Sequence, residues 1–207
     1  MLHADVQYVH LQCDSGRGLE LVSTEIGETM EHVKFVLPNA PMRSITINRG
    51  MIMRGWFDLT TLSLDEMVDE DGVMESISQN EIDSGIASNR IVVGGISQGV
   101  TIALGAGISS EYPLAGMFGF SGFLRIQEKI IQMSTQANKN TPIFMTHGDS
   151  DELVDYQYGK QSSEFLKKNG QVGVKDGKFC CAEKIQLKFQ ADYIVELTGI
   201  LTKLLLI

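Results

Sequence analysis

A serine in a glycine-flanked turn is the first group in this chain that could do covalent chemistry. Residues 91–99 read IVVGGISQG, so Gly95, Ser97 and Gly99 form a G-x-S-x-G sequence between a β-branched run and a helical segment. A strand-to-helix turn that presents a serine strains the backbone, and glycines two residues before and after the serine leave the necessary room. The sequence predicts Ser97 as a nucleophile and the backbone N–H of Gln98 as a donor to a developing oxyanion.

The same residues could instead form a glycine-rich helix cap or a dinucleotide-binding turn. However, VGGISQG lacks the order G-x-G-x-x-G, and nowhere in the chain is a glycine-lysine pair followed by serine or threonine. Both of those phosphate-binding patterns need their glycines at fixed positions. We therefore favour the nucleophile.

Two carboxylates follow a later predicted strand. The strand at 141–147 leads into HGDSDELV, which contains Asp149 and Asp151. Functional side chains of an open parallel sheet gather beyond the carboxyl ends of its strands. Asp151 stands 54 positions after Ser97, which fits the chain order serine, acid, histidine of the α/β-hydrolases. The alternative is a solvated acidic turn at the start of a helix.

Histidine is scarce, and none follows the candidate acid. The only histidines are His3, His10, His32 and His147, all of which precede Asp151. We expect structural roles for them, although His10 lies near the expected site and an approach to Ser97 is the alternative for it. An imidazole takes the serine proton and later returns it to the leaving group, so its loss typically lowers the rate by about four to six orders of magnitude.

Predicted strands and helices alternate along the chain. Strands are expected at 5–12, 32–37, 90–94, 114–120, 141–147 and 183–189. Helices are expected at 19–30, 70–86, 99–110, 124–136 and 156–169, and the segment 42–64 is expected to be a long ordered loop. This alternation predicts one α/β domain over residues 1–207, with a mostly parallel sheet and helices on both faces.

Composition narrows the possible partners. With a net charge of −9, the chain is not expected to bind nucleic acid, which needs clustered Lys and Arg. Cys13, Cys180 and Cys181 have no metal-binding spacing, so reduced thiols in the cytosol are expected, without metal or cofactor. No signal peptide is visible, and the apolar tail 193–207 is too short and too polar to span a membrane. Its helical spacing predicts packing on the sheet.

Taken in order, the motifs resemble those of the acyl-protein thioesterases and the related carboxylesterases and lysophospholipases of the α/β-hydrolase superfamily. The likeness runs from about residue 5 to 170 and rests on VHLQCDSGRG, VKFVLPNAP, GWFDL, the DEDG helix start, SGIASNRIVVGGISQG, LAGMFGFSGFL and HGDSDELV.

The resemblance implies Ser97 as nucleophile, Asp151 as the acid that orients a histidine, and the N–H groups of Gln98 and Gln12 as oxyanion donors. It also implies hydrolysis of palmitoyl thioesters on proteins, carboxylic esters or lysophospholipids through an acyl-serine intermediate. The expected location is the cytoplasm and also the nucleus. Contact with a membrane surface would be transient.

The chain departs from the family pattern in four places, one of which is the predicted helix between Asp69 and Ile86, about six residues shorter than in the family. His10-Leu11-Gln12-Cys13-Asp14 stands where the family has a glycine-containing H-G-x-G-D turn. The amino end is expected to be truncated, because the family's first strands would precede Met1. The carboxyl end is expected to be altered, because KIQLKF leads into an apolar tail where the family has a G-x-x-H turn.

Three interpretations remain open from the sequence. The first is a cytosolic serine hydrolase of the acyl-protein thioesterase type. The second is a catalytically impaired relative that only binds acyl chains or lipidated peptides, with Met51, Met53 and Trp56 lining an apolar groove. The third is an incomplete hydrolase whose ends come from an altered reading frame or splice form.

Overall fold

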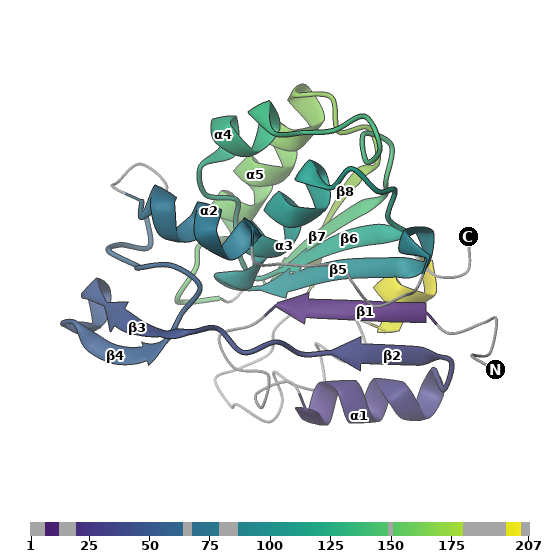
Figure 1. Ribbon diagram of the computed structural model, residues 1–207, viewed down its shortest axis with the longest axis horizontal. Helices are drawn as coiled ribbons and strands as arrows, with labels where there is room; N and C mark the ends of the chain where they lie inside the picture. The colour runs from purple at the N-terminus through teal and green to yellow at the C-terminus, as the bar shows by residue number, and fades with distance from the viewer. Residues whose placement is uncertain are drawn as a thin grey trace.

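A six-stranded parallel sheet forms the centre of the protein. The structure is a computed structural model that describes residues 7–12, 20–63, 68–78, 87–148, 151–179 and 198–203. The strand order is β2-β1-β5-β6-β7-β8, and all five neighbouring pairs are parallel (Figure 1). These strands are β1 (Gln7–Gln12), β2 (Val33–Val36), β5 (Ile91–Ile96), β6 (Gly116–Phe120), β7 (Ile143–Gly148) and β8 (Val174–Phe179).

Helices cover both faces of this sheet, as expected from the alternation of elements. They are α1 (Glu20–Thr29), α2 (Glu70–Ser78), α3 (Gly99–Ser109), α4 (Gln127–Gln132) and α5 (Tyr156–Lys168), with 3-10 turns η2 (Thr46–Asn48) and η3 (Ser88–Arg90). Helices α2 to α5 lie on one face and α1 lies on the other (Figure 1). Residues 198–203 are also helical, and they pack on the face that α1 covers.

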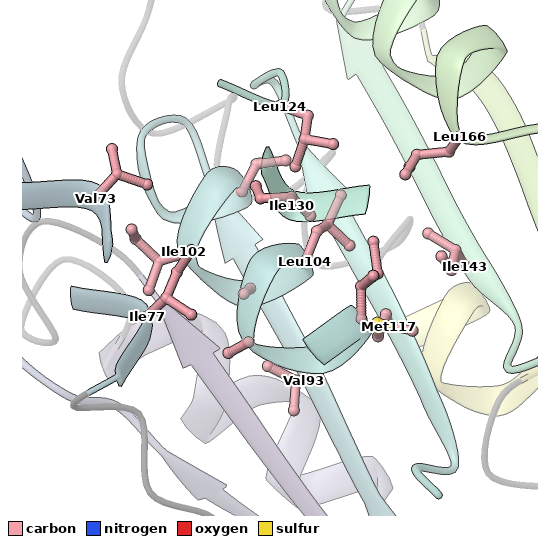
Figure 2. Packing of buried hydrophobic residues seen from close by; sticks show 14 of the residues in the cluster. Val73, Ile77, Val93, Ile102, Leu104, Met117, Leu124, Ile130, Ile143 and Leu166 are labelled. Carbon is pink, nitrogen blue, oxygen red and sulfur yellow. The ribbon is translucent and has the colours of Figure 1, made fainter. Parts of the chain in front are cut away.

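The central strands divide their side chains between two cores. Ile91 and Val93 of β5 belong to the core under α2 to α5, whereas Val92 between them belongs to the other core. Side chains alternate along a strand, so this run of apolar residues serves both faces of a buried parallel sheet. Figure 2 shows the first core, where side chains of α2, α3, α4 and α5 meet those of the sheet: Val73, Ile77, Ile102, Leu104, Ile130 and Leu166 against Val93, Met117 and Ile143.

The segment expected to be a long loop contains a β-hairpin instead. Strands β3 (Met42–Ile45) and β4 (Met51–Arg54) pair antiparallel, and Arg49 (φ 58°) and Gly50 (φ 74°) close the turn. Figure 1 shows the hairpin projecting from the edge where the strands of the main sheet end. Most of its side chains are exposed or partly exposed, so the sequence has no alternation of buried and exposed residues that would predict strands.

Other predicted boundaries moved for local reasons. The edge strand β8 was not predicted, because VKDGKF is polar and contains Asp and Gly. Helix α4 begins only at Gln127, since the preceding Ile126 has a left-handed backbone (φ 43°). The predicted strand 183–189 lies outside the described residues. No helix in the described ranges is long and apolar enough to cross a membrane.

Because all six strands run the same way, their carboxyl ends meet at one edge. There Gln12 of β1 pairs with Gly95, and Ile96 of β5 pairs with Phe120 of β6. The fold therefore brings the end of β5, which leads into Ser97, between two neighbouring strand ends.

Candidate active site

Ser97 lies in the tight turn between β5 and α3. Its φ of 52° is in the left-handed region, which costs a residue with a side chain about 1–3 kcal/mol. The turn is held because the Ser97 N–H donates to the carbonyl of Phe120 (2.9 Å) and the Val100 N–H donates to the carbonyl of Ser97 (3.1 Å). The Ser97 residue is exposed. The strained turn therefore presents its hydroxyl at the surface and not within the packed core.

Glycines make this turn sterically possible. A Cβ atom on Gly95 would overlap the carbonyl of Gly99 and come within 2.5 Å of the Val100 nitrogen. A Cβ atom on Gly122 would overlap the carbonyl of Ser97 itself. A glycine is needed two residues before the serine because the two ends of the turn are in direct contact. Gly122, which is not part of the motif, is needed for the same reason.

Gln98 connects the turn to a distant segment through its side chain. Its Oε1 accepts from the backbone N–H of Trp56 (2.7 Å), and its Nε2 donates to the carbonyl of Phe57 (2.8 Å). Both halves of the amide are therefore used, across 41 and 42 positions of sequence. The sequence predicted a role for the backbone N–H of Gln98 only, because a side-chain contact over this distance leaves no local pattern.

An apolar pocket adjoins Ser97. The space free of protein atoms in and around it is about 320 Å³, part of which is open solvent. Its lining consists of Phe57, Leu59, Leu62, Ser97, Gln98, Thr101, Gly122, Phe123, Arg125 and Val154. Five of these ten residues are hydrophobic or aromatic, which suits an acyl chain next to the serine hydroxyl.

Asp151 lies beyond β7 and is held from three sides. Its Oδ1 accepts from the backbone N–H groups of Leu153 and Val154, each at 3.0 Å. Its Oδ2 lies 3.4 Å from Nε2 of His147, a buried side chain that is 3% exposed. The same Nε2 is 2.8 Å from the carbonyl oxygen of Val154. Because a carbonyl oxygen can only accept, this contact puts a proton on Nε2, which then also points toward Asp151.

These contacts lower the pKa of Asp151. Burial is the largest single influence and raises the pKa, but the hydrogen bonds from His147, Val154 and Leu153 together outweigh it. His147 therefore acts as a structural partner of the acid. From the sequence, His147 was expected to have a structural role, but no local pattern paired it with Asp151, because the two residues are not in a helix.

Asp151→Asn should change how stability depends on pH. A lowered pKa means that the ionised carboxylate stabilises the folded state above its unfolded-state pKa near 3.8, and that this stabilisation is lost as pH falls through the lower folded-state pKa. Urea unfolding of both proteins at a series of pH values should show a stability difference that is largest above pH 3.8 and shrinks at lower pH. Parallel stability curves down to acid pH would contradict this.

Asp151 and Ser97 line adjoining pockets. A second, more open pocket of about 880 Å³ is lined by Asp151, Glu152 and Tyr156, among others, and it shares Leu62 with the pocket of Ser97. Val154, which donates to Asp151, lines the pocket of Ser97. His147 lines a third pocket, and among the residues that the structure describes this pocket shares Gly122 alone with that of Ser97.

The other predicted site residues lie in different parts of the fold. The backbone of Gln12 is paired beside Gly95 at the end of β1. Met51 is 64% exposed on the hairpin, Met53 is partly buried, and Trp56 is 7% exposed within the core. None of these last three is among the described residues that line the pocket of Ser97.

Some predicted residues cannot be placed. Asp149 and the three cysteines lie outside the described residues. Among the residues that the structure does describe, no three His, Cys, Asp or Glu side chains gather in a way that could hold a metal ion.

The parallel sheet, the serine turn after β5 and the acid beyond β7 together define an α/β-hydrolase. A crystal structure of a SOBER1 variant from Arabidopsis thaliana has the same fold, with a TM-score of 0.82 at 23% identity. The match covers 97% of this chain and 99% of the other.

Sequence comparison gives the family. The model described as Phospholipase/Carboxylesterase matches residues 8–186. An acyl-protein thioesterase 1 of Yarrowia lipolytica is 34% identical over 172 residues, which cover 79% of this chain and 76% of the relative. An acyl-protein thioesterase 1 of Mycosarcoma maydis is 33% identical over 221 residues, which cover 98% and 91%. The chain belongs to the phospholipase/carboxylesterase family, and the family and fold predicted from its motifs are confirmed.

Proposed function

We propose that the protein hydrolyses acyl thioesters on proteins and related carboxylic esters or lysophospholipids, with Ser97 as the nucleophile. The observation that carries this proposal is an exposed serine at φ 52° beside an apolar pocket. The relatives named acyl-protein thioesterase 1 support the thioester substrate, and the family description supports esters and phospholipids.

The reaction has two halves. In the first, Ser97 Oγ attacks the acyl carbonyl carbon, a C–O bond forms, and the C–S bond to the substrate cysteine breaks, so that a thiol leaves. The backbone N–H of Gln98 stabilises the oxyanion, with the N–H of Gln12 as the second donor in this proposal. Water then attacks the acyl-serine, which releases the fatty acid and restores the hydroxyl. The acyl chain occupies the pocket of Phe57, Leu59 and Leu62.

The proton of Ser97 needs an acceptor, and no histidine follows Asp151 in the chain. Asp151 is assigned as the acid by family resemblance, with His147 as its buried neighbour. We assign the first proton transfer to solvent, which can reach the exposed Ser97. The expected rate is about four to six orders of magnitude below that of a complete triad.

This assignment has a pH signature. A histidine base would make the rate level off above its pKa of about 6.5, whereas transfer to hydroxide should make the rate keep rising with pH. We expect the hydrolysis of a 4-nitrophenyl ester and of a palmitoyl thioester peptide to be slow and to rise steadily up to at least about pH 9. A plateau near neutral pH would contradict the assignment to solvent.

A covalent probe tests the nucleophile itself. A fluorophosphonate should become attached to Ser97 slowly, because no base activates the hydroxyl, and mass spectrometry of the labelled peptide should identify the site; Ser109→Ala should leave the label unchanged. Ser109 is a matched control because its hydroxyl donates to a carbonyl within α3 and lies outside the pocket. Acyl-chain binding without label or turnover would favour the non-catalytic relative instead.

A further inference from the structure

Arg125 is a buried arginine that lines the pocket of Ser97 and reaches across the fold. The residue is only 3% exposed. Its Nη1 donates to the carbonyl of Ser63 (2.8 Å) and its Nη2 donates to the carbonyl of Thr61 (2.5 Å). The guanidinium carbon lies 4.8 Å from the centre of the Phe123 ring. Two carbonyls and an aromatic face therefore surround a desolvated cation.

The two carbonyls belong to the segment 56–63, which forms one wall of the pocket. Phe57, Leu59 and Leu62 of this wall segment all line the pocket. Gln98 holds its beginning through Trp56 and Phe57. Arg125 holds its end, so the wall is fixed at both ends to groups that themselves line the pocket beside Ser97.

The middle of the wall segment is also anchored, but away from the pocket. The carboxylate of Asp58 accepts from the N–H and the hydroxyl of Thr46 (2.7 and 2.6 Å). The N–H of Asp58 donates to Asp69 (2.8 Å). Leu59 is held as well, because its carbonyl accepts from the N–H of Ile47 (2.8 Å). Leu62 lies between Thr61 and Ser63, whose carbonyls Arg125 binds, so the position of Leu62 relative to Ser97 depends on Arg125.

We infer that Arg125 is a positioning residue that sets how long an acyl chain the pocket accepts. The inference rests on the proposed function, because it concerns the pocket of the same serine. Arginine suits this role because its planar fork offers two donors at a fixed spacing, which lysine cannot reproduce. If Arg125 is lost, Leu62 should shift, and long acyl chains should lose more contact than short ones.

Arg125→Met should therefore change selectivity and not only stability. For a 4-nitrophenyl dodecanoate substrate we expect KM to rise by about tenfold or more with kcat nearly kept, while the acetate ester changes by less than about twofold. Arg125→Lys, which keeps the charge but has a single donor nitrogen, should give an intermediate selectivity and guards against loss of the fold. Leu62→Ala should reproduce the loss of preference for the long chain.

A matched control separates this effect from the loss of any arginine. Arg54 on the hairpin also donates to a backbone carbonyl, that of Ala40 (2.8 Å), but it lies outside the pocket. Arg54→Met should therefore leave the ratio of long-chain to short-chain hydrolysis unchanged.

Binding provides a readout without catalysis. Trp56 is the single tryptophan of the chain and adjoins Phe57 in the wall segment, so its emission should report laurate binding. Arg125→Met should weaken laurate binding by about tenfold or more, even if the protein turns over no ester. Failure of turnover with this binding difference intact would refute the proposed function alone. Equal laurate affinity and equal chain-length selectivity in the wild type and both Arg125 variants would overturn the inference. A wild type that neither binds laurate nor distinguishes long from short acyl chains would also overturn it.

Discussion

Ser97→Gly should abolish covalent labelling by a fluorophosphonate and at the same time stabilise the protein relative to Ser97→Ala. Both variants remove the hydroxyl, so both should lose the label completely. Only glycine adopts φ 52° without steric cost. The relief of about 1–3 kcal/mol of strain is offset in part by the extra freedom that glycine gives the unfolded chain. A net gain of about 1 kcal/mol over alanine is expected in urea unfolding.

A second serine gives the matched control. Ser110, which follows α3, has an ordinary φ of −64°. Here Ser110→Gly should be less stable than Ser110→Ala, because glycine loses more conformational freedom on folding and no strain is relieved. If the glycine variant were the less stable of the pair at both positions, strain at Ser97 would be ruled out. A protein that becomes more stable when its strained nucleophile is replaced is typical of a site that is kept for function.

Gly95→Ala should be among the most destabilising single substitutions in this chain. The added methyl group would meet backbone atoms of Gly99 and Val100, which cannot move aside as a flexible side chain can. The overlapping atoms belong to the end of β5 and to the first turn of α3. Relieving the overlap must therefore displace the serine turn between them. We expect a loss of about 3 kcal/mol, at the upper end of the range for overpacking, together with loss of the covalent label.

The control for this substitution is a glycine with open space around it. Gly27 lies within α1, and a Cβ atom there would meet nothing within 4 Å. Gly27→Ala should therefore stabilise the protein by about 0.5–1 kcal/mol, because alanine is the better helix former. Thermal or urea unfolding of the two variants measures both effects. Similar small changes at the two positions would show that the turn tolerates a side chain.

Features that depend on local sterics could be predicted from the sequence. The spacing of Gly95 and Ser97 predicts the turn, and the β-branched run before them indicates a buried strand. Asp151, the proposed acid, was selected by the order of motifs, since it follows the next strand but one. The residues of the turn lie within a few positions of one another, and the steric demand behind their spacing is local.

Features that depend on long-range contacts could not be predicted. The side-chain amide of Gln98 meets Trp56 across 42 positions, and Arg125 meets Thr61 across 64. Nothing near Arg125 in the sequence indicates that its guanidinium is buried. The acyl-binding residues were sought among Met51, Met53 and Trp56 because of their composition, whereas the described pocket is lined by their neighbours Phe57, Leu59 and Leu62. Composition therefore pointed to a neighbouring stretch of chain, because packing decides which side chains line a pocket.

The core that lies under α1 has a consequence for biosynthesis. Ile26 of α1 shares this core with Ile200 and Leu201, which are made 174 and 175 residues later. Until these two residues have emerged from the ribosome, the aromatic side chains of Phe118 and Phe144 lack part of their cover. A nascent chain that has already formed its serine turn therefore still exposes hydrophobic surface that is prone to aggregation. Its yield in the cell should depend on how well chaperones shield it during that interval.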